Sequence, residues 1–283
     1  MQRIIILATL GIVACIAFLP SQASAQPETP LTVRFLGTPR GAATWITTPA
    51  KRTILVDCGD VAFGRQLVLQ LQTLAVPSID VLATTQAAPE LYGGCIELLS
   101  HSVDLPVSSV LLNGQTDQSS SLWQTFSSLL PSSQTLLTAG TVLDWGPSAS
   151  RGDVTATVLN PVNAAQPSPN QSDDGVVLSI AFAGRSLMLV GAISDASASR
   201  LAASAAGSVD VMAVAAPGLG GPAVSALLQA FQPATVVLTY ATVQGSPGDD
   251  TRRLWASNGS RVMSTLDNGT ITATVADSVS FKP

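Results

Sequence analysis

The stretch IDVLATTQAAPELYGGCIELL, residues 79–99, places a buried strand, a short loop and a helix in immediate succession. The apolar run 79–82 is typical of a buried strand. The helix is expected to begin at about Pro89, because proline is tolerated in the first turn of a helix. Loops of this kind often carry binding or catalytic groups. This one contains Thr, Gln and Ala but no histidine.

Strand and helix patterns on both sides of this stretch predict an α/β fold. Three β-rich runs come first, which predicts an antiparallel meander over residues 31–37, 42–48 and 52–58. Apolar residues at helical spacing then predict a helix over 63–76. Downstream we expect strands at 79–85, 108–114, 153–161, 175–184, 185–192, 209–216, 234–241, 261–267 and 270–277, and helices at 122–130, 194–206, 222–231 and 250–258. This order predicts two sheets stacked face to face with helices outside, and the polar loop 163–174 is too short to separate domains.

The N-terminus has the pattern of a secretory signal peptide. One arginine precedes an apolar run, residues 4–19, and Ala23-Ser24-Ala25 forms a small-x-small cleavage pattern. We expect residues 1–25 to be removed and residues 26–283 to form a single domain. A retained membrane anchor is one alternative, although the apolar run is short for a span. A lipoprotein attached through Cys15 is another. Each alternative places the folded chain outside the cytoplasm, and cleavage after residue 25 would leave no integral membrane segment in the mature chain.

The composition is that of a compact globular chain with an acidic balance. Hydrophobic residues make up 46% of the sequence and charged residues 11%, which excludes a disordered chain. Removing Arg3 with the signal leaves 12 of the 13 basic residues against 18 acidic ones. The longest basic clusters are Lys51-Arg52 and Arg252-Arg253. This balance weighs against nucleic acid as a partner, because net negative charge repels a phosphate backbone. The sequence identifies no other partner.

Two cysteines, Cys58 and Cys95, remain in the mature chain. In an oxidising compartment, an even pair is more often bridged than free, provided that the fold brings the two together. The pair supplies too few soft ligands for a structural zinc site.

The order of these pieces resembles the metallo-β-lactamase superfamily, specifically the hydrolase domain of ComEC-type proteins of DNA internalisation. The resemblance runs from about residue 31 to residue 275. Residues 33–60 resemble the opening strands of that family, which end in IDGG or IDCG, and residues 79–99 resemble its segment VLTHxHxDHxGG. Residues 172–193 are similar to a strand pair NDxSVVLxLxxGxxxxLLTGD, 209–221 to VDVLKVxHHGS, and 239–247 to a strand followed by GHP. The resemblance implies a four-layer αββα sandwich of the metallo-β-lactamase type.

The chain departs from that family at its metal-ligand positions. There, imidazoles and carboxylates hold one or two Zn-class ions, which lower the pKa of bound water and generate hydroxide. Aligned on Gly93-Gly94, the histidine positions of the first motif carry Gln86, Ala88 and Leu91, and the aspartate position carries Glu90. Other substitutions are Gly37 and Ala42 for the opening aspartates, Ala192 for the bridging aspartate, Ala216 and Pro217 for the paired histidines, and Ser246 for the last histidine. Since alanine, leucine and proline side chains cannot ligate a metal, the resemblance implies a degenerate site with no metal and no cofactor.

Some oxygen donors survive near the expected site. Asp57, Gln86, Glu90 and Ser246, together with Asp173 and Asp174, could hold Mg²⁺ or Ca²⁺ weakly. Helix capping explains Asp57 and Glu90 equally well. The single histidine, His101, lies past the helix at none of these positions, and we expect it on the surface or in a turn.

The resemblance also implies a structural substitute for the metal. In that family the loops that correspond to Cys58 and Cys95 converge beside the metal, so a disulfide between them is expected, together with an apolar, partly filled pocket. The implied function is that of an exported pseudoenzyme with a binding or scaffold role. The alternative is a metal-dependent hydrolase of the nuclease or phosphodiesterase kind, related to ComEC. Metal-free nucleophilic catalysis is disfavoured, because no GxSxG motif and no Ser-His pair is recognisable.

Overall fold

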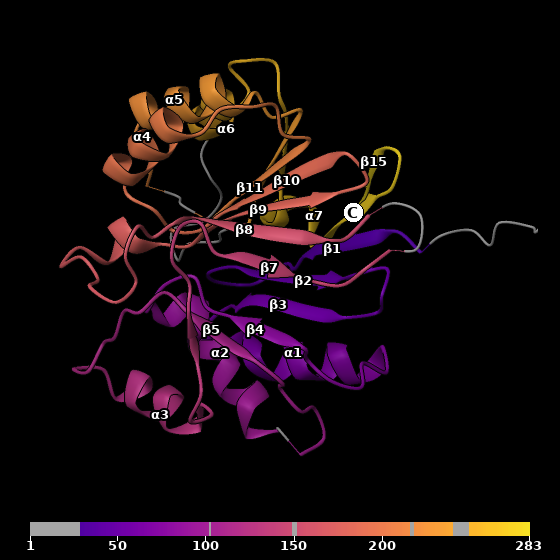
Figure 1. Cartoon of the computed structure of the whole chain (residues 1–283), viewed down its shortest axis with the longest axis vertical. Helices are drawn as coiled ribbons and strands as arrows, with labels where there is room; N and C mark the ends of the chain where they lie inside the picture. The colour runs from indigo at the N-terminus through magenta and orange to yellow at the C-terminus, as the bar shows by residue number, and fades with distance from the viewer. Residues whose placement is uncertain (1–28, 102, 149–151, 216–217, 240–248) are drawn as a thin grey trace, which may run out of the picture.

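Two β-sheets lie face to face between two layers of helices in the computed structural model (Figure 1). The structure describes residues 29–101, 103–148, 152–215, 218–239 and 249–283. The first sheet has the order β15-β14-β1-β2-β3-β4-β5-β6, with β1 Leu31–Phe35, β2 Ala43–Thr47, β3 Thr53–Cys58, β4 Val81–Ala83, β5 Val110–Leu112, β6 Thr135–Leu136, β14 Ile271–Val275 and β15 Val279–Lys282. The second has the order β13-β12-β11-β10-β9-β8-β7, with β7 Val142–Asp144, β8 Thr155–Asn160, β9 Val177–Phe182, β10 Arg185–Val190, β11 Val211–Val214, β12 Thr235–Leu238 and β13 Arg261–Ser264.

The helices form the two outer layers. Beside the first sheet lie α1 Val61–Thr73, α2 Pro89–Ser100 and α3 Ser121–Leu129 (Figure 1). Beside the second sheet lie α4 Asp195–Ser204, α5 Gly221–Phe231 and α6 Asp249–Trp255. Two short elements complete the fold, the 3₁₀ helix η1 Gln171–Asp174 and the helix α7 Thr265–Asn268. Within the described part of the chain, every helix is too short or too polar to cross a membrane.

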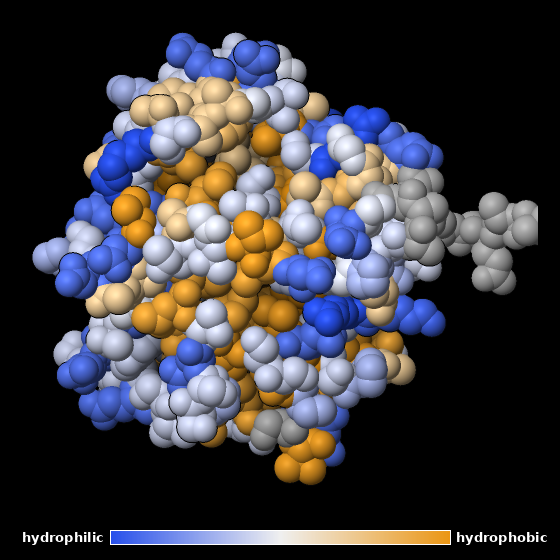
Figure 2. Space-filling view, viewed as in Figure 1, coloured by the Kyte–Doolittle hydropathy of each residue, from blue (hydrophilic) through white to orange (hydrophobic). Residues whose placement is uncertain are grey.

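Three apolar cores hold the layers together. The core between the sheets includes Phe35, Ile54 and Leu187. A second core, with Leu67 of α1 and Leu98 of α2, joins the first sheet to its helices, and a third joins the second sheet to α4, α5 and α6. Seen edge-on, apolar residues gather across the middle of the molecule and hydrophilic residues lie around its rim (Figure 2). Burial on both faces of each sheet follows from this stacking, and the structure confirms the αββα sandwich.

The parallel part of each sheet brings several loops to one place. Strands β3, β4 and β5 are parallel neighbours in the first sheet, and β10, β11 and β12 are parallel neighbours in the second. The carboxyl ends of parallel neighbours lie at the same edge of a sheet, which is the usual location of sites in such folds. The loops after β3, β4, β10 and β11 therefore define the region in which a functional site is expected.

Local sequence signals account for several element boundaries. The Asp60 carboxylate accepts a hydrogen bond from the N–H of Phe63 at 3.1 Å and starts α1. Either Ser194 or Asp195 was expected to cap the next helix, and the structure shows that Ser194 caps α4, since its hydroxyl accepts from the N–H of Ser197 at 3.1 Å. Strands β9 and β10 pair antiparallel as a hairpin, and its turn residues Ala183 and Gly184 have φ of 53° and 70°.

The fold differs from expectation in its short elements. Residues 261–267 do not form one strand, because β13 ends at Ser264, whose hydroxyl accepts from the N–H of Leu266 and caps α7. Strands β6, β7 and β15 were not expected. Both side chains of β6 are exposed, so that strand has no apolar alternation from which to predict it.

Candidate functional site

Loops from the two sheets meet at the carboxyl ends of β3, β4 and β10. The N–H of Val176, just before β9, donates to the carbonyl of Thr85, in the loop after β4, at 2.9 Å. A side chain at Gly191, after β10, would lie 3.2 Å from Cβ of Thr85. Because no side chain separates Gly191 from Thr85, the two loops pack directly on each other.

An apolar cluster occupies this meeting point. Ala42, Leu91 and Ala215 are buried at 3%, 0% and 6% exposure, and Ala88 and Ala192 pack against them. These residues come from the loop before β2, the loop after β4, the first turn of α2 and the loops after β10 and β11. The structure thus brings together Ala88, Leu91 and Ala192, which the sequence alignment placed at ligand positions. Ala216, Pro217 and Ser246 lie outside the described residues.

Asp57, the penultimate residue of β3, is buried beside this cluster at 3% exposure. Its Oδ1 accepts from the backbone N–H of Thr85 at 2.8 Å, and its Oδ2 accepts from the Thr85 hydroxyl at 2.7 Å. Burial raises the pKa of the carboxyl to about 7, and the two hydrogen bonds from Thr85 limit that rise because they favour the charged form. The capping role proposed for Asp57 is wrong, since the cap of α1 is Asp60. Asp57 instead ties β3 to the loop after β4.

Two further polar candidates, Gln86 and Glu90, flank Ala88 in the sequence. Gln86 is 5% exposed, and its Nε2 donates to Oγ of Ser172 at 3.4 Å. Glu90 lies in the first turn of α2, where a carboxylate is favoured by the helix dipole, as expected. A side chain at Gly41, which has φ of 76°, would lie 1.6 Å from the Glu90 carbonyl oxygen, so the loop before β2 packs tightly on this turn.

A network of amide side chains, which the sequence interpretation missed, holds η1 over the same region. The Nδ2 of Asn113 donates to Oε1 of Gln115 at 2.7 Å and to the Asp174 carbonyl at 3.1 Å. The Nε2 of Gln115 donates to the Gln171 carbonyl at 2.6 Å. The Nδ2 of Asn160 donates to the Gly175 carbonyl at 2.7 Å. The loop 163–174 lies mostly at the surface, and hydrogen bonds from Asn113 and Gln115, just after β5, fix its last turn.

Asp173 and Asp174 are part of this anchored turn. The carboxylate of Asp173 accepts from the hydroxyls of Ser168 at 3.2 Å and Ser194, and from Nδ2 of Asn170 at 3.2 Å. The carboxylate of Asp174 accepts from the N–H of Ser168. Both carboxylates are therefore held by their own and neighbouring loops.

A disulfide joins Cys58 at the end of β3 to Cys95 in α2, as predicted, with a Cα–Cα distance of 5.2 Å. The two glycines before Cys95 allow this approach. A side chain at Gly94 would lie 2.1 Å from the Cys58 carbonyl oxygen, and one at Gly93 would lie 2.7 Å from the Val61 nitrogen. The glycine pair is thus required by the contact between α2 and the loop before α1.

The donors in this region do not fit a Zn-class ion. Among the described residues there is no group of three or more His, Cys, Asp or Glu side chains that could hold a metal. Both oxygens of Asp57 accept hydrogen bonds from Thr85. Leu91, Ala88 and Ala192 present only hydrocarbon at the centre. His101, at the C-terminus of α2, contacts the Glu97 carbonyl through Nδ1 at 2.9 Å, and it lies in a turn as expected.

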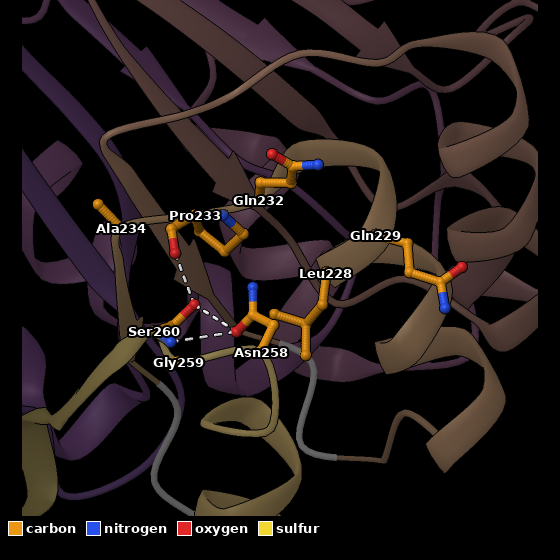
Figure 3. A pocket seen from close by; sticks show the side chains of 8 residues that line it. All are labelled: Leu228, Gln229, Gln232, Pro233, Ala234, Asn258, Gly259 and Ser260. Atoms are coloured by element: carbon orange, nitrogen blue, oxygen red, sulfur yellow. Dashed lines mark hydrogen bonds between the residues drawn. The ribbon is translucent and has the colours of Figure 1, made fainter.

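A separate cavity of about 500 Å³ lies at the far end of the second sheet, between α5, β12 and the turn before β13 (Figure 3). The Ser260 hydroxyl contacts the Pro233 carbonyl and donates to it, and Oδ1 of Asn258 lies 2.7 Å from the same hydroxyl. Gln229 and Gln232 project away from Ser260 (Figure 3). The residues that line this cavity include no titratable side chain, so they supply no acid, no base and no charged metal ligand.

No protein-family model matches the sequence, and no curated protein matches it. Among solved structures, the metallo-β-lactamase fold protein YhfI from Bacillus subtilis has a TM-score of 0.58 and 12% identity, covering 85% of this chain and 99% of YhfI. The diiron β-hydroxylase CmlA from Streptomyces venezuelae has a TM-score of 0.55 and 13% identity, covering 88% of this chain and 55% of CmlA. A metallo-β-lactamase from Cronobacter sakazakii with a HARLDQ motif has a TM-score of 0.40 and 18% identity, covering 56% of this chain and 60% of that one.

These comparisons define the fold. YhfI and CmlA superpose over most of the present chain, which therefore has the metallo-β-lactamase fold. The chain spans about 55% of the length of CmlA and 60% of the Cronobacter enzyme. At these identities the likeness extends to the fold alone.

Proposed function

We propose that the protein is an exported pseudoenzyme of the metallo-β-lactamase fold, related to the ComEC-type domains, with a binding or scaffold role. The observation that carries this proposal is the apolar cluster of Ala42, Ala88, Leu91, Ala192 and Ala215 where the loops of the two sheets meet. A hydrolase of this fold needs donors at that point to hold a metal and to lower the pKa of its bound water. Hydrocarbon side chains supply neither a ligand nor a proton acceptor.

The disulfide and the hydrogen-bonded loops supply the order that a metal would otherwise give. The Cys58–Cys95 bridge closes a loop of 37 residues beside the cluster. In the loop-closure model a bridge of that span contributes about 4 kcal/mol to the free energy of unfolding. Asp57 and the Asn113–Gln115 pair fix the surrounding loops from both sides. These constraints support the proposal that the loops around the cluster are stable without metal.

Export is supported by the N-terminal pattern and by the disulfide. Disulfides persist in oxidising compartments and are rare in the cytosol of most cells. The signal-peptide residues and Cys15 lie outside the described residues, so cleavage after residue 25 remains part of the proposal. An acidic chain, of formal net charge −5, also favours a partner other than nucleic acid.

Turnover assays test the proposal against a metal-dependent hydrolase. The exported protein, with its disulfide intact, is assayed with added Zn²⁺ or Mn²⁺ on a chromogenic phosphodiester, single- and double-stranded DNA and a β-lactam. We expect no turnover above the buffer with metal. Turnover that a chelator abolishes would contradict the proposal, provided that substituting the polar candidates Gln86→Ala and Glu90→Gln also removes it. Activity that survives both substitutions would also contradict the proposal if it co-purifies with the protein on refractionation, whereas activity that separates from the protein belongs to a contaminant.

A further inference from the structure

A groove of about 530 Å³ lies on the outer face of the first sheet, beside α1 and away from the apolar cluster. The floor comes from β1, β2 and β14 with their flanking residues, and the wall comes from one flank of α1. Its lining includes Arg34, Leu36, Trp45, Leu69, Leu74 and Thr272. None of these lining residues is acidic.

A cation lies on the floor of the groove. Arg34 of β1 is directly opposite Trp45 of β2 and Thr272 of β14, so the three side chains share the outer face of the sheet. The Arg34 guanidinium lies 4.6 Å from the centre of the Trp45 ring, and its Nη1 donates to the Thr47 hydroxyl at 3.2 Å. Lys282 is opposite Thr272 in the next strand, so it lies on the same face, with its Cα two strands or roughly 10 Å from that of Arg34.

Most N–H donors of Arg34 have no acceptor among the described residues. Of the ion pairs between described residues, none involves Arg34. A guanidinium has five N–H donors, and only one hydrogen bond from Arg34 is present in the described part of the chain. The indole Nε1 of Trp45 is buried and likewise has no acceptor among the described residues. Burial lowers the pKa of Arg34, which nevertheless stays charged because arginine does not lose its proton in proteins. A partly buried cation of this kind is stabilised by a bound anion.

The remaining lining is apolar at the centre and polar at the rim. Leu36 and Trp45 are buried in the floor at 2% and 5% exposure. Leu69 of α1 and Leu74, the C-cap residue of that helix, are exposed at 53% and 59%, which is high for leucine side chains that border a groove. A ligand complementary to these groups combines one anionic head with a hydrocarbon chain.

We propose that this groove binds an aliphatic carboxylic acid in its ionised form, with the carboxylate on the Arg34 guanidinium and the hydrocarbon chain along Leu36, Leu69 and Leu74. The planar guanidinium suits a carboxylate, which it binds through two parallel hydrogen bonds. The volume lies in the range of small-molecule sites in proteins. The groove shares no residue with the apolar cluster, so the inference holds or fails independently of the pseudoenzyme proposal.

Binding of decanoate to the exported protein tests the proposal. The indole N–H signal of Trp45, one of four tryptophans, is assigned with Trp45→Phe and followed by ¹H–¹⁵N NMR during the titration. We expect a saturable shift of that signal, and at least tenfold weaker binding for decanol, acetate and Arg34→Gln, because a hydrogen-bonded charge pair and the buried chain each contribute about that factor. Arg34→Lys keeps the charge without the paired hydrogen bonds and should bind with intermediate affinity. Arg65→Gln, an exposed arginine of α1 that does not line the groove, is the matched control and should bind like the unchanged protein.

Three outcomes would overturn the proposal. The first is the absence of a saturable shift of the Trp45 signal. The second is equal decanoate affinity for Arg34→Gln and Arg65→Gln in samples whose circular dichroism shows a folded chain. The third is equal affinity for decanoate and either reference compound, since the charge or the hydrocarbon would then contribute nothing.

Discussion

Asp57 should make the stability of this fold depend on pH. Burial raises the pKa of its carboxyl from 3.8 to about 7. Between those two values the folded chain holds a proton that the unfolded chain has lost, so the free energy of unfolding falls as the pH rises. The fall begins near the unfolded pKa and levels off above the folded one. A displacement of about three pKa units corresponds to about 4 kcal/mol in total, of which roughly two thirds is lost between about pH 5 and about pH 8.

The substitution Asp57→Asn isolates this contribution. An asparagine Oδ1 can accept from the Thr85 N–H, and its Nδ2 can donate to the Thr85 hydroxyl, so both contacts are kept. Asparagine also tolerates the φ of 58° at this position better than most residues. In Asp57→Asn, the free energy of unfolding should change much less between about pH 5 and about pH 8 than in the unchanged protein. The matched control Asp104→Asn, in an exposed turn after α2, should retain it.

The free energies of unfolding are measured by urea denaturation of the oxidised protein at about pH 5 and about pH 8, with linear extrapolation to zero urea. A stability that rises with pH in the unchanged protein would refute the reasoning. The same conclusion would follow if Asp57→Asn and Asp104→Asn declined equally, because the effect would then arise elsewhere in the chain.

Three further predictions concern the frame around the cluster. Replacing both Cys58 and Cys95 by alanine should lower the free energy of unfolding by about 4 kcal/mol, measured by urea denaturation, and an effect under about 1 kcal/mol would count against the bridge as the main constraint. Gly94→Ala should lower the free energy of unfolding by more than about 2 kcal/mol, because the added Cβ would lie 2.1 Å from the Cys58 carbonyl oxygen. The control Gly221→Ala, whose Cβ would have no atom within 4 Å, should change the melting temperature little. Gln115→Ala should cost about 1–3 kcal/mol by leaving buried amide and carbonyl groups unpaired, and faster hydrogen exchange should appear in η1 before any other element loosens.

The layered fold was predictable because apolar residues recur at strand or helix spacing along most of the chain. The meander that ends at Cys58 and the strand, loop and helix around Gln86 follow from local patterns that burial reinforces. The short exposed strand β6 carries no such pattern. The disulfide followed from the resemblance rather than from the positions of the cysteines in the sequence.

Contacts between distant segments were not predictable. Gln115 and Gln171 are 56 residues apart. In the sequence both look like ordinary polar loop residues, because only the stacking of the two sheets brings them into contact. Asp57 was assigned to a cap because its partner Thr85 lies 28 residues away. The pairing of Arg34 with Trp45 requires the register of β1 and β2, which a sequence alone does not provide. A useful signal in retrospect is an asparagine at or just after the end of a strand, as at Asn160 and Asn113.

The most direct test of the central claim is a metal-binding measurement on the exported protein. The oxidised chain is saturated with Zn²⁺ or Mn²⁺, passed over a desalting column and analysed by mass spectrometry of metals, and its thermal unfolding is recorded with metal and with chelator. The account predicts substoichiometric metal and the same melting temperature in both conditions. One or two ions retained per chain, with stabilisation of about 3 kcal/mol at a hundredfold excess over the dissociation constant, would contradict it.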